Sequence, residues 1–153
     1  MSRLRLASYN IHSGVGSDGR LNLERIARVL REIDADVIGL QEVDTGTESD
    51  PALPQWRYLA EALELHGVPA PTLEREGGPY GNALLLPGEP TRSETLDLSV
   101  EPFEPRSALI ATLEVRGEIL TVAVAHLGLR WRERVIQARR LAERLAGAEG
   151  PSA

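Results

Sequence analysis

Residues 4–44 read LRLASYNIHSGVGSDGRLNLERIARVLREIDADVIGLQEVD, and their pattern is typical of a strand, a helix and a second strand. Residues 3–11 alternate between two sets of side chains, as strands do. Asn22 precedes an apolar stripe at helical spacing and is expected to cap the helix. Residues 37–40 are apolar throughout, which predicts a buried strand. The short connections make this a β-α-β unit, whose two strands run parallel.

Three polar residues stand where the expected strands end. Asn10 stands where the first strand runs out, Glu42 follows the second, and His126 follows an apolar strand over residues 119–125. Open α/β sheets bind ligands beyond the carboxyl ends of their strands. If the first two strands are neighbours, Asn10 and Glu42 lie side by side at one edge of the sheet. An amide, a carboxylate and an imidazole that meet there suit metal-assisted phosphate chemistry.

The remaining sequence predicts further helices and strands. Helices are expected from Pro54 to about Gly67 and over residues 131–146. Strands are expected over residues 82–86, 92–98, 107–115 and 119–125, and irregular segments over residues 44–54 and 69–79. On the last helix, the residues expected to face inward are Val135, Ala138, Leu141, Ala142 and Leu145. These elements predict an α/β fold in which mixed sheets pack together with helices outside, within a single domain over residues 1–153.

Composition limits the class of protein. The chain has 153 residues, 42% hydrophobic residues, no cysteine and a net charge of −6. It contains no apolar run of about 18 residues, so no transmembrane segment is expected, and no hydrophobic signal region opens it. The lack of cysteine excludes disulfides and thiolate metal sites and favours a cytoplasmic location. The acidic charge argues against non-specific binding of long nucleic acids and for a small or locally held substrate.

The three strand-end residues each have a candidate role. Glu42 is the candidate metal ligand, because Mg²⁺ binds one or two protein carboxylates and completes its shell with water and phosphate oxygens. Asn10 is a candidate for orienting a phosphate oxygen or a carboxylate, and His126 for acting as a general acid or stabilising charge on phosphorus. The alternatives are a solvated glutamate, a turn-forming asparagine and a histidine bonded to backbone. His12 and His66 are not expected to be catalytic.

Two further features have competing interpretations. Arg106 precedes a strand and is a candidate for binding phosphate, whereas a surface salt bridge with Glu101 or Glu104 is the alternative. Residues 14–19, GVGSDG, match the pattern G-x-G-x-x-G, with Glu42 where a ribose-binding acid is expected, which suggests dinucleotide binding as a rival function. In that motif the helix opens within the glycines, however, and here it is expected to begin only at about residue 22.

Taken together, the segments resemble the endonuclease/exonuclease/phosphatase superfamily, the group of DNase I-like proteins. The resemblance is carried in order by residues 9–44, by PYGNALLL at 79–86, by EPRSALIATLEV at 104–115 and by AHLGLRWRERVIQARRL at 125–141. It implies a DNase I-like α/β sandwich, in which two mixed sheets pack face to face with helices outside. It also implies Mg²⁺- or Mn²⁺-dependent hydrolysis of a phosphodiester or phosphomonoester.

The resemblance assigns roles position by position. It implies that Glu42 binds Mg²⁺, that Asn10 holds phosphate or a metal-binding carboxylate, and that His126 contacts the scissile phosphate. Asn82, within PYGNALLL, and Arg106 are expected to bind substrate. The expected substrates are phosphoesters of nucleic acids, phospholipid headgroups or inositol phosphates.

The sequence departs from the family pattern in several places. Ser107 stands where Gly is usual after Glu-Pro-Arg, Ala125 where Thr is usual, and residues 86–88 where Ser-Arg is common. The Gly-Asp-x-Asn and Ser-Asp-His motifs that close the family pattern do not occur. The chain is therefore expected to represent the N-terminal portion of the domain and to be inactive or nearly so by itself. We also expect self-association, or a partner, where the missing part leaves a sheet uncovered. A non-catalytic remnant or interaction module of the same fold is the alternative function.

Overall fold

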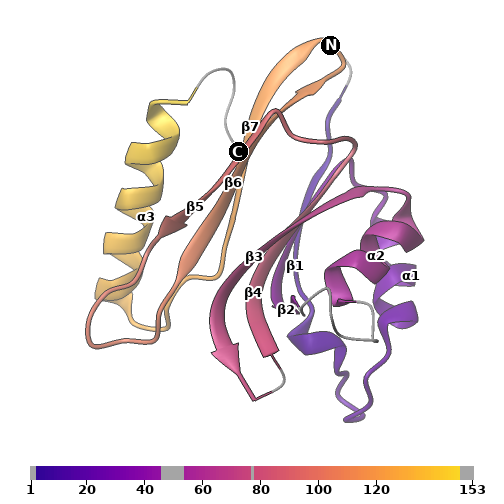
Figure 1. Ribbon diagram of the computed structural model, residues 1–153, viewed down its shortest axis with the longest axis horizontal. Helices are drawn as coiled ribbons and strands as arrows, with labels where there is room; N and C mark the ends of the chain where they lie inside the picture. The colour runs from indigo at the N-terminus through magenta and orange to yellow at the C-terminus, as the bar shows by residue number, and fades with distance from the viewer. Residues whose placement is uncertain (1–2, 46–53, 77, 149–153) are drawn as a thin grey trace.

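The computed structural model describes residues 3–45, 54–76 and 78–148, and it shows two β-sheets packed face to face between helices (Figure 1). The strands are β1 (Leu6–Asn10), β2 (Val37–Asp44), β3 (His66–Arg75), β4 (Gly78–Leu86), β5 (Arg92–Asp97), β6 (Ser107–Val115) and β7 (Glu118–Ala125). The helices are α1 (Leu23–Ile33), α2 (Gln55–Leu63) and α3 (Trp131–Ala146), and a short 3₁₀ turn, η1 (His12–Gly14), follows β1.

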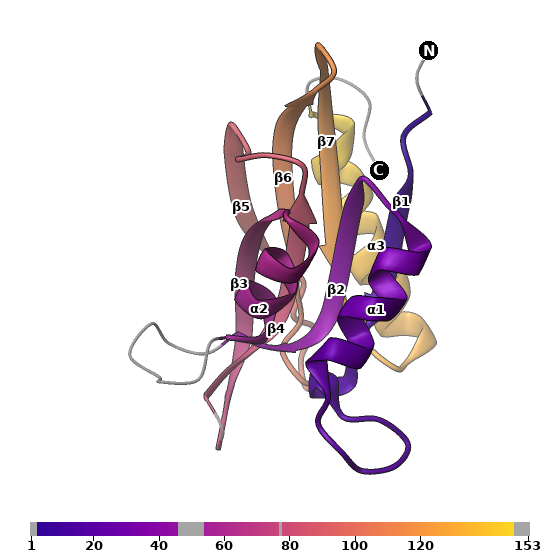
Figure 2. The ribbon, with the colours of Figure 1, turned by 90° about the vertical axis from the view of Figure 1, so that its right-hand side faces the viewer.

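The two sheets differ in strand direction. The first has the order β1-β2-β4-β3, with β1 parallel to β2 and the other pairs antiparallel. The second, β5-β6-β7, is antiparallel throughout. Helices α1 and α2 cover the outer face of the first sheet, and α3 lies on the outer side of the second (Figures 1 and 2). This arrangement confirms the predicted α/β sandwich.

The β-α-β unit has the predicted structure. Strands β1 and β2 are parallel neighbours, and Asn10 pairs with Gln41 at their ends. The side chain of Asn22 caps α1, because its Oδ1 accepts a hydrogen bond of 2.9 Å from the backbone N–H of Arg25. Local pattern alone therefore predicted how this part of the sheet is built.

Replacing Asn22 by alanine is expected to destabilise the protein by about 1 kcal/mol, because one N–H at the start of α1 loses its partner. For a chain of this size, that change lowers the melting temperature by about 2–4 °C. Thermal unfolding followed by circular dichroism measures it. Asn22→Asp is the matched control, because aspartate caps equally well. An alanine variant as stable as the aspartate variant would contradict the assignment of the cap.

Two hydrophobic clusters hold the layers together. The first lies between α1, α2 and the first sheet, and its fully buried members include Leu30, Leu40, Leu59 and Leu85. The second lies between the two sheets and includes Leu84, Leu86, Leu113 and Val124. A Cβ atom at Gly39 would lie 2.9 Å from Cγ2 of Val124, so glycine here permits the close approach of the sheets.

The prediction for residues 67–79 was wrong. Gly67 does not end a helix, because α2 already ends at Leu63 and Glu64 caps it with a left-handed φ of 56°. Most of the segment predicted to be irregular forms β3, although it contains Pro69 and Pro71. Because β3 is the outer strand of its sheet, it tolerates residues that lack an N–H for the ladder. Most of the loop predicted over residues 44–54 lies outside the described residues.

The bounds of α3 were predicted correctly, but its inward face was not. Val135 is 38% exposed, whereas the polar Glu133 and Gln137 are buried. Gln137 accepts a hydrogen bond of 2.8 Å from Gly128 N and donates one of 3.2 Å to Leu98 O. The buried stripe of α3 is therefore polar, because it satisfies backbone groups of the loops on which the helix rests.

Candidate active site

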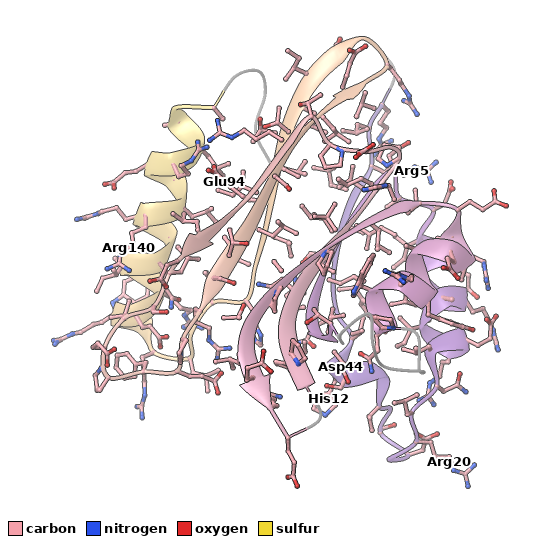
Figure 3. The ribbon with its side chains drawn as sticks, in the orientation of Figure 1. Arg5, His12, Arg20, Asp44, Glu94 and Arg140 are labelled. Carbon is pink, nitrogen blue, oxygen red and sulfur yellow. The ribbon has the colours of Figure 1, made fainter. Side chains whose placement is uncertain are left out.

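Asn10, His12 and Glu42 form a ring of hydrogen bonds at the carboxyl ends of β1 and β2. Asn10 Nδ2 donates to Glu42 Oε1 at 2.8 Å, and His12 Nδ1 donates to Glu42 Oε2 at 3.1 Å. The backbone N–H of His12 donates to Asn10 Oδ1 at 3.0 Å, which closes the ring. Figure 3 shows His12 and Asp44 at this end of the first sheet, far from Glu94 and Arg140 beside α3. The structure thus brings Asn10 and Glu42 together as predicted.

His126 reaches the same cluster from the second sheet. It directly follows β7, and its Nε2 lies 3.8 Å from Glu42 Oε1. The side chains of Glu42 and His126 are 20% and 29% exposed, so both are partly sheltered and still accessible. The structure confirms the predicted proximity of an amide, a carboxylate and an imidazole at this edge of the molecule.

An irregularity in β2 turns Glu42 away from the helices and toward this rim. The register of β2 against β4 shifts between Leu40 and Val43, and both of these residues pack in the cluster beneath the helices. Glu42 has a φ of 56°, a value that non-glycine residues rarely adopt. His12 and Ser13 have similar φ values of 49° and 52°. Backbone strain of this kind concentrates at functional sites.

Tyr80 and Arg75 belong to the cluster and were not predicted. The hydroxyl of Tyr80 donates a hydrogen bond to the carboxylate of Glu42. The guanidinium carbon of Arg75 lies 3.5 Å from the centre of the Tyr80 ring, a cation–π contact. Tyr80 reaches Glu42 because β4 pairs Tyr80 with Asp44. The sequence contains no signal for this contact, because it depends on the register of an antiparallel pair.

The environment shifts the pKa values of both central groups. Burial raises the pKa of the Glu42 carboxyl, but hydrogen bonds from Asn10, His12 and Tyr80 outweigh burial and place the pKa below its ordinary value. Burial, assisted by the charge of Arg106, lowers the pKa of His126, and the nearby Glu42 opposes this only in part. At neutral pH the site therefore presents an ionised carboxylate beside a neutral imidazole.

Asn82 and Arg106 line a hollow beside His126. Both are more buried than we expect for residues that contact a substrate. Asn82 is 2% exposed, and its Nδ2 donates to Ser107 O at 3.1 Å. Arg106 Nη1 pairs with Glu104 at 2.9 Å, which is one of the two salt bridges foreseen. Ser107, which replaces the usual glycine, bonds through its hydroxyl to Thr72 and so joins β6 to β3.

Other candidate residues lie elsewhere. His66 begins β3 at the opposite end of the strand from Arg75 and pairs with Leu86, so it takes no part in the cluster. The guanidinium of Arg25 lies beside Gly16 and bonds Asp18. Helix α1 begins only at Leu23, after the glycines, as the sequence predicted, so the structure argues against the dinucleotide-binding interpretation.

The cluster fits a hard divalent cation in its chemistry. Glu42 is an ionised, partly exposed carboxylate held in place by three hydrogen bonds. Mg²⁺ typically uses one or two protein carboxylates and fills its other positions with water and substrate oxygens. Within the described residues, no group of three or more His, Cys, Asp or Glu side chains has the arrangement of a metal cage. The residues present therefore suit an open site with a single carboxylate ligand.

A profile of the Endonuclease/Exonuclease/phosphatase family matches residues 7–152. The chain belongs to this family. The comparison with curated proteins found no match.

Solved structures of similar fold agree with the family assignment. An endonuclease/exonuclease/phosphatase from Beutenbergia cavernae DSM 12333 is 26% identical, with a TM-score of 0.76, over 92% of this chain and 43% of that chain. The human Nocturnin catalytic domain, solved with a bound sulfate anion, is 20% identical, with a TM-score of 0.69, over 97% and 62% of the two chains. A humanized TDP2 from D. rerio is 21% identical, with a TM-score of 0.68, over 97% and 58%. The chain thus spans between about two fifths and three fifths of the length of these proteins.

Proposed function

We propose that this chain carries the metal-binding and phosphate-binding part of a Mg²⁺- or Mn²⁺-dependent phosphoesterase. The observation that supports this proposal best is that two side chains from different sheets reach the carboxylate of Glu42 in β2. Asn10, at the end of β1, bonds it at 2.8 Å, and His126, directly after β7, lies 3.8 Å from it. Membership of a family of nucleases and phosphatases supports the same reaction class.

In this proposal the side chains have distinct tasks. Glu42 holds the ion, while Asn10, His12 and Tyr80 orient its carboxylate. His126 is neutral at neutral pH, so its ring N–H donates a hydrogen bond to a phosphate oxygen. A bound Mg²⁺ supplies stabilisation for negative charge that develops on the phosphate. Arg106, beside His126, adds a fixed positive charge.

The proposed substrates are phosphoesters of nucleic acids, phospholipid headgroups or inositol phosphates. The net charge of −6 favours a small phosphoester over long duplex DNA, because non-specific binding of nucleic acid requires basic surfaces. The cytoplasmic location stays a prediction that rests on the absence of cysteine.

We further propose that the isolated chain hydrolyses phosphoesters poorly. The sequence contains neither of the two acidic motifs that family resemblance leads us to expect. Among the described residues, Glu42 is the carboxylate in contact with the imidazoles, and Glu104 is paired with Arg106. Loss of a general base alone typically lowers the rate by a factor of about 10²–10⁴.

Binding and hydrolysis are measured separately to test this function. The chain is expected to bind Mn²⁺, and then inorganic phosphate, as seen by calorimetry and by paramagnetic broadening of the ³¹P signal. It is expected to hydrolyse a chromogenic phosphodiester in Mg²⁺ at no more than the background rate. Failure to bind the metal and phosphate would overturn the phosphoesterase proposal. Hydrolysis that disappears in Glu42→Ala would instead overturn the proposed lack of activity.

We also propose that the chain self-associates through the open edges of its sheets. Strands β1 and β7 are both outer strands, and they flank a cavity of about 320 Å³. Its lining comes from both sheets and includes the apolar Leu84 and Val122 as well as the polar Ser8 and Gln41. Unpaired edges of this kind form templates for another chain. We expect dimers or larger species in sedimentation velocity at tens of micromolar. A monomer at all concentrations would count against this interface.

No helix in the described part of the chain has the length and apolar character needed to cross a membrane.

A further inference from the structure

A small polar hollow lies beside His126, between the two sheets. It has a volume of about 10 Å³, and its lining includes Thr72, Tyr80, Asn82, Arg106, Ser107 and His126. One water molecule needs a cavity of about 10–15 Å³. The hollow is therefore close to the size of a single water molecule.

Two buried polar atoms at this hollow have no hydrogen-bond partner. They are the Oδ1 of Asn82, a residue 2% exposed, and the Nε of Arg106. The orientation of the Asn82 amide is determined by its surroundings, because the atom that faces the carbonyl oxygen of Ser107 must be the NH₂ group. Its Oδ1 is therefore an acceptor, whereas the Nε–H of Arg106 is a donor.

The pairing of one acceptor with one donor selects the ligand. A cation would suit the Asn82 oxygen but would be repelled by the Arg106 guanidinium. An anion would suit Arg106 but would face the lone pairs of the Asn82 oxygen. Water donates and accepts at once, and buried waters typically make about three hydrogen bonds to such groups.

We infer that this hollow is a binding site for one buried water molecule, which links Asn82 Oδ1 to Arg106 Nε. The water donates to Asn82 and accepts from Arg106, and its second hydrogen is available to a further acceptor of the lining. Asn82 is then a positioning residue: it holds one side of the Arg106 guanidinium, while Glu104 holds the other through Nη1 at 2.9 Å. That Arg106 so held faces a bound phosphate rests on the function proposed above. The water site itself does not depend on that function.

A crystal structure of the full chain is the first test. The expected result is one ordered water within hydrogen-bonding distance of both Asn82 Oδ1 and Arg106 Nε. A direct hydrogen bond between these two atoms, or a dry hollow, would overturn the inference. Neither metal nor substrate is needed, so this outcome is independent of whether the chain binds Mn²⁺ and phosphate.

Solution NMR of the arginine Nε–H groups is the second test. The Arg106 signal is expected to exchange slowly with solvent and to show a nuclear Overhauser effect to water. In Asn82→Leu its exchange rate is expected to rise about tenfold, the factor for losing one charge-assisted hydrogen bond. Thr112→Val is the control, because it removes a polar group of the second sheet that bonds Thr121 instead. It is expected to leave the Arg106 signal unchanged.

The NMR outcomes separate a water bridge from a merely structural role of Asn82. Fast exchange of the Arg106 Nε–H in the unmodified protein would overturn the inference. An unchanged Arg106 signal in a folded Asn82→Leu protein would do the same. If Asn82→Leu does not fold, the water contact and the exchange rate measured in the unmodified protein decide the question.

Discussion

Replacing Glu42 by glutamine is expected to abolish the binding of Mg²⁺ and Mn²⁺ to this chain. Glutamine keeps the shape of the side chain but removes the negative charge, and among the described residues Glu42 is the carboxylate that Asn10, His12 and His126 surround. By contrast, Tyr80→Phe removes only a hydrogen bond to that carboxylate. Loss of such an orienting partner typically lowers metal affinity by about 10–100-fold. Calorimetry with Mg²⁺ and water-proton relaxation with Mn²⁺ measure both effects.

The matched control is Glu24→Gln. Glu24 is also a carboxylate with hydrogen-bond partners, but it lies on α1 and bonds Arg31 and Tyr58. Its substitution is expected to leave metal binding unchanged. If a folded Glu42→Gln protein binds the metal as tightly as the Glu24→Gln protein does, the ion binds elsewhere. The proposed roles of Asn10 and His126 would then be wrong as well.

Replacing Gly81 by alanine is expected to give the largest loss of stability among substitutions of the glycines that the structure describes. A Cβ atom there would lie 2.2 Å from the backbone oxygen of Ala70 and 2.8 Å from the backbone nitrogen of Thr72. These are backbone atoms of β3, so the clash is relieved only by moving the strand. Overpacking costs typically about 1–3 kcal/mol, and we expect the upper end of that range because no side chain can yield. Urea denaturation measures the change.

Gly88→Ala is the control for this substitution. A Cβ atom at Gly88 meets nothing within 4 Å. The free energy of unfolding of the Gly88→Ala protein is therefore expected to stay within about 0.5 kcal/mol of that of the unmodified protein. Because β3 and β4 carry Thr72, Tyr80 and Asn82, Gly81→Ala is also expected to weaken phosphate binding, whereas Gly88→Ala is not. Equal midpoints for the two alanine variants would show that β3 is not held against β4 in this register.

Much of the fold could be predicted because local patterns determine single elements. The apolar stripe after Asn22 has the period of a helix, and the apolar runs of β6 and β7 are typical of buried strands. The predictions failed where a neighbour decides the outcome. β3 is a strand because β4 lies beside it, and α3 buries Gln137 because the carbonyl of Leu98 needs a partner.

The candidate site divides in the same way. The positions of Asn10 and His126 at strand ends could be read from the sequence, whereas Glu42 was predicted to follow its strand and lies inside β2, which continues to Asp44. The parallel pairing of β1 with β2 followed from the helical crossover between them. His12 was not expected to take part, because its contact with Glu42 requires a left-handed backbone at both residues. Tyr80 was missed because its place depends on the antiparallel pairing of β4 with β2.

By itself, the sequence of this family member determined the order of its elements, the parallel start of the first sheet and the rim at which an amide, an acid and an imidazole meet. Tertiary structure alone decided where Glu42 points, through the register shift between Leu40 and Val43. It also decided which atoms of Asn82 and Arg106 are buried without partners. The physical reason is that periodicity acts between residues a few positions apart, whereas the contact of Asn10 with Glu42 joins residues 32 positions apart and depends on the packing of whole strands.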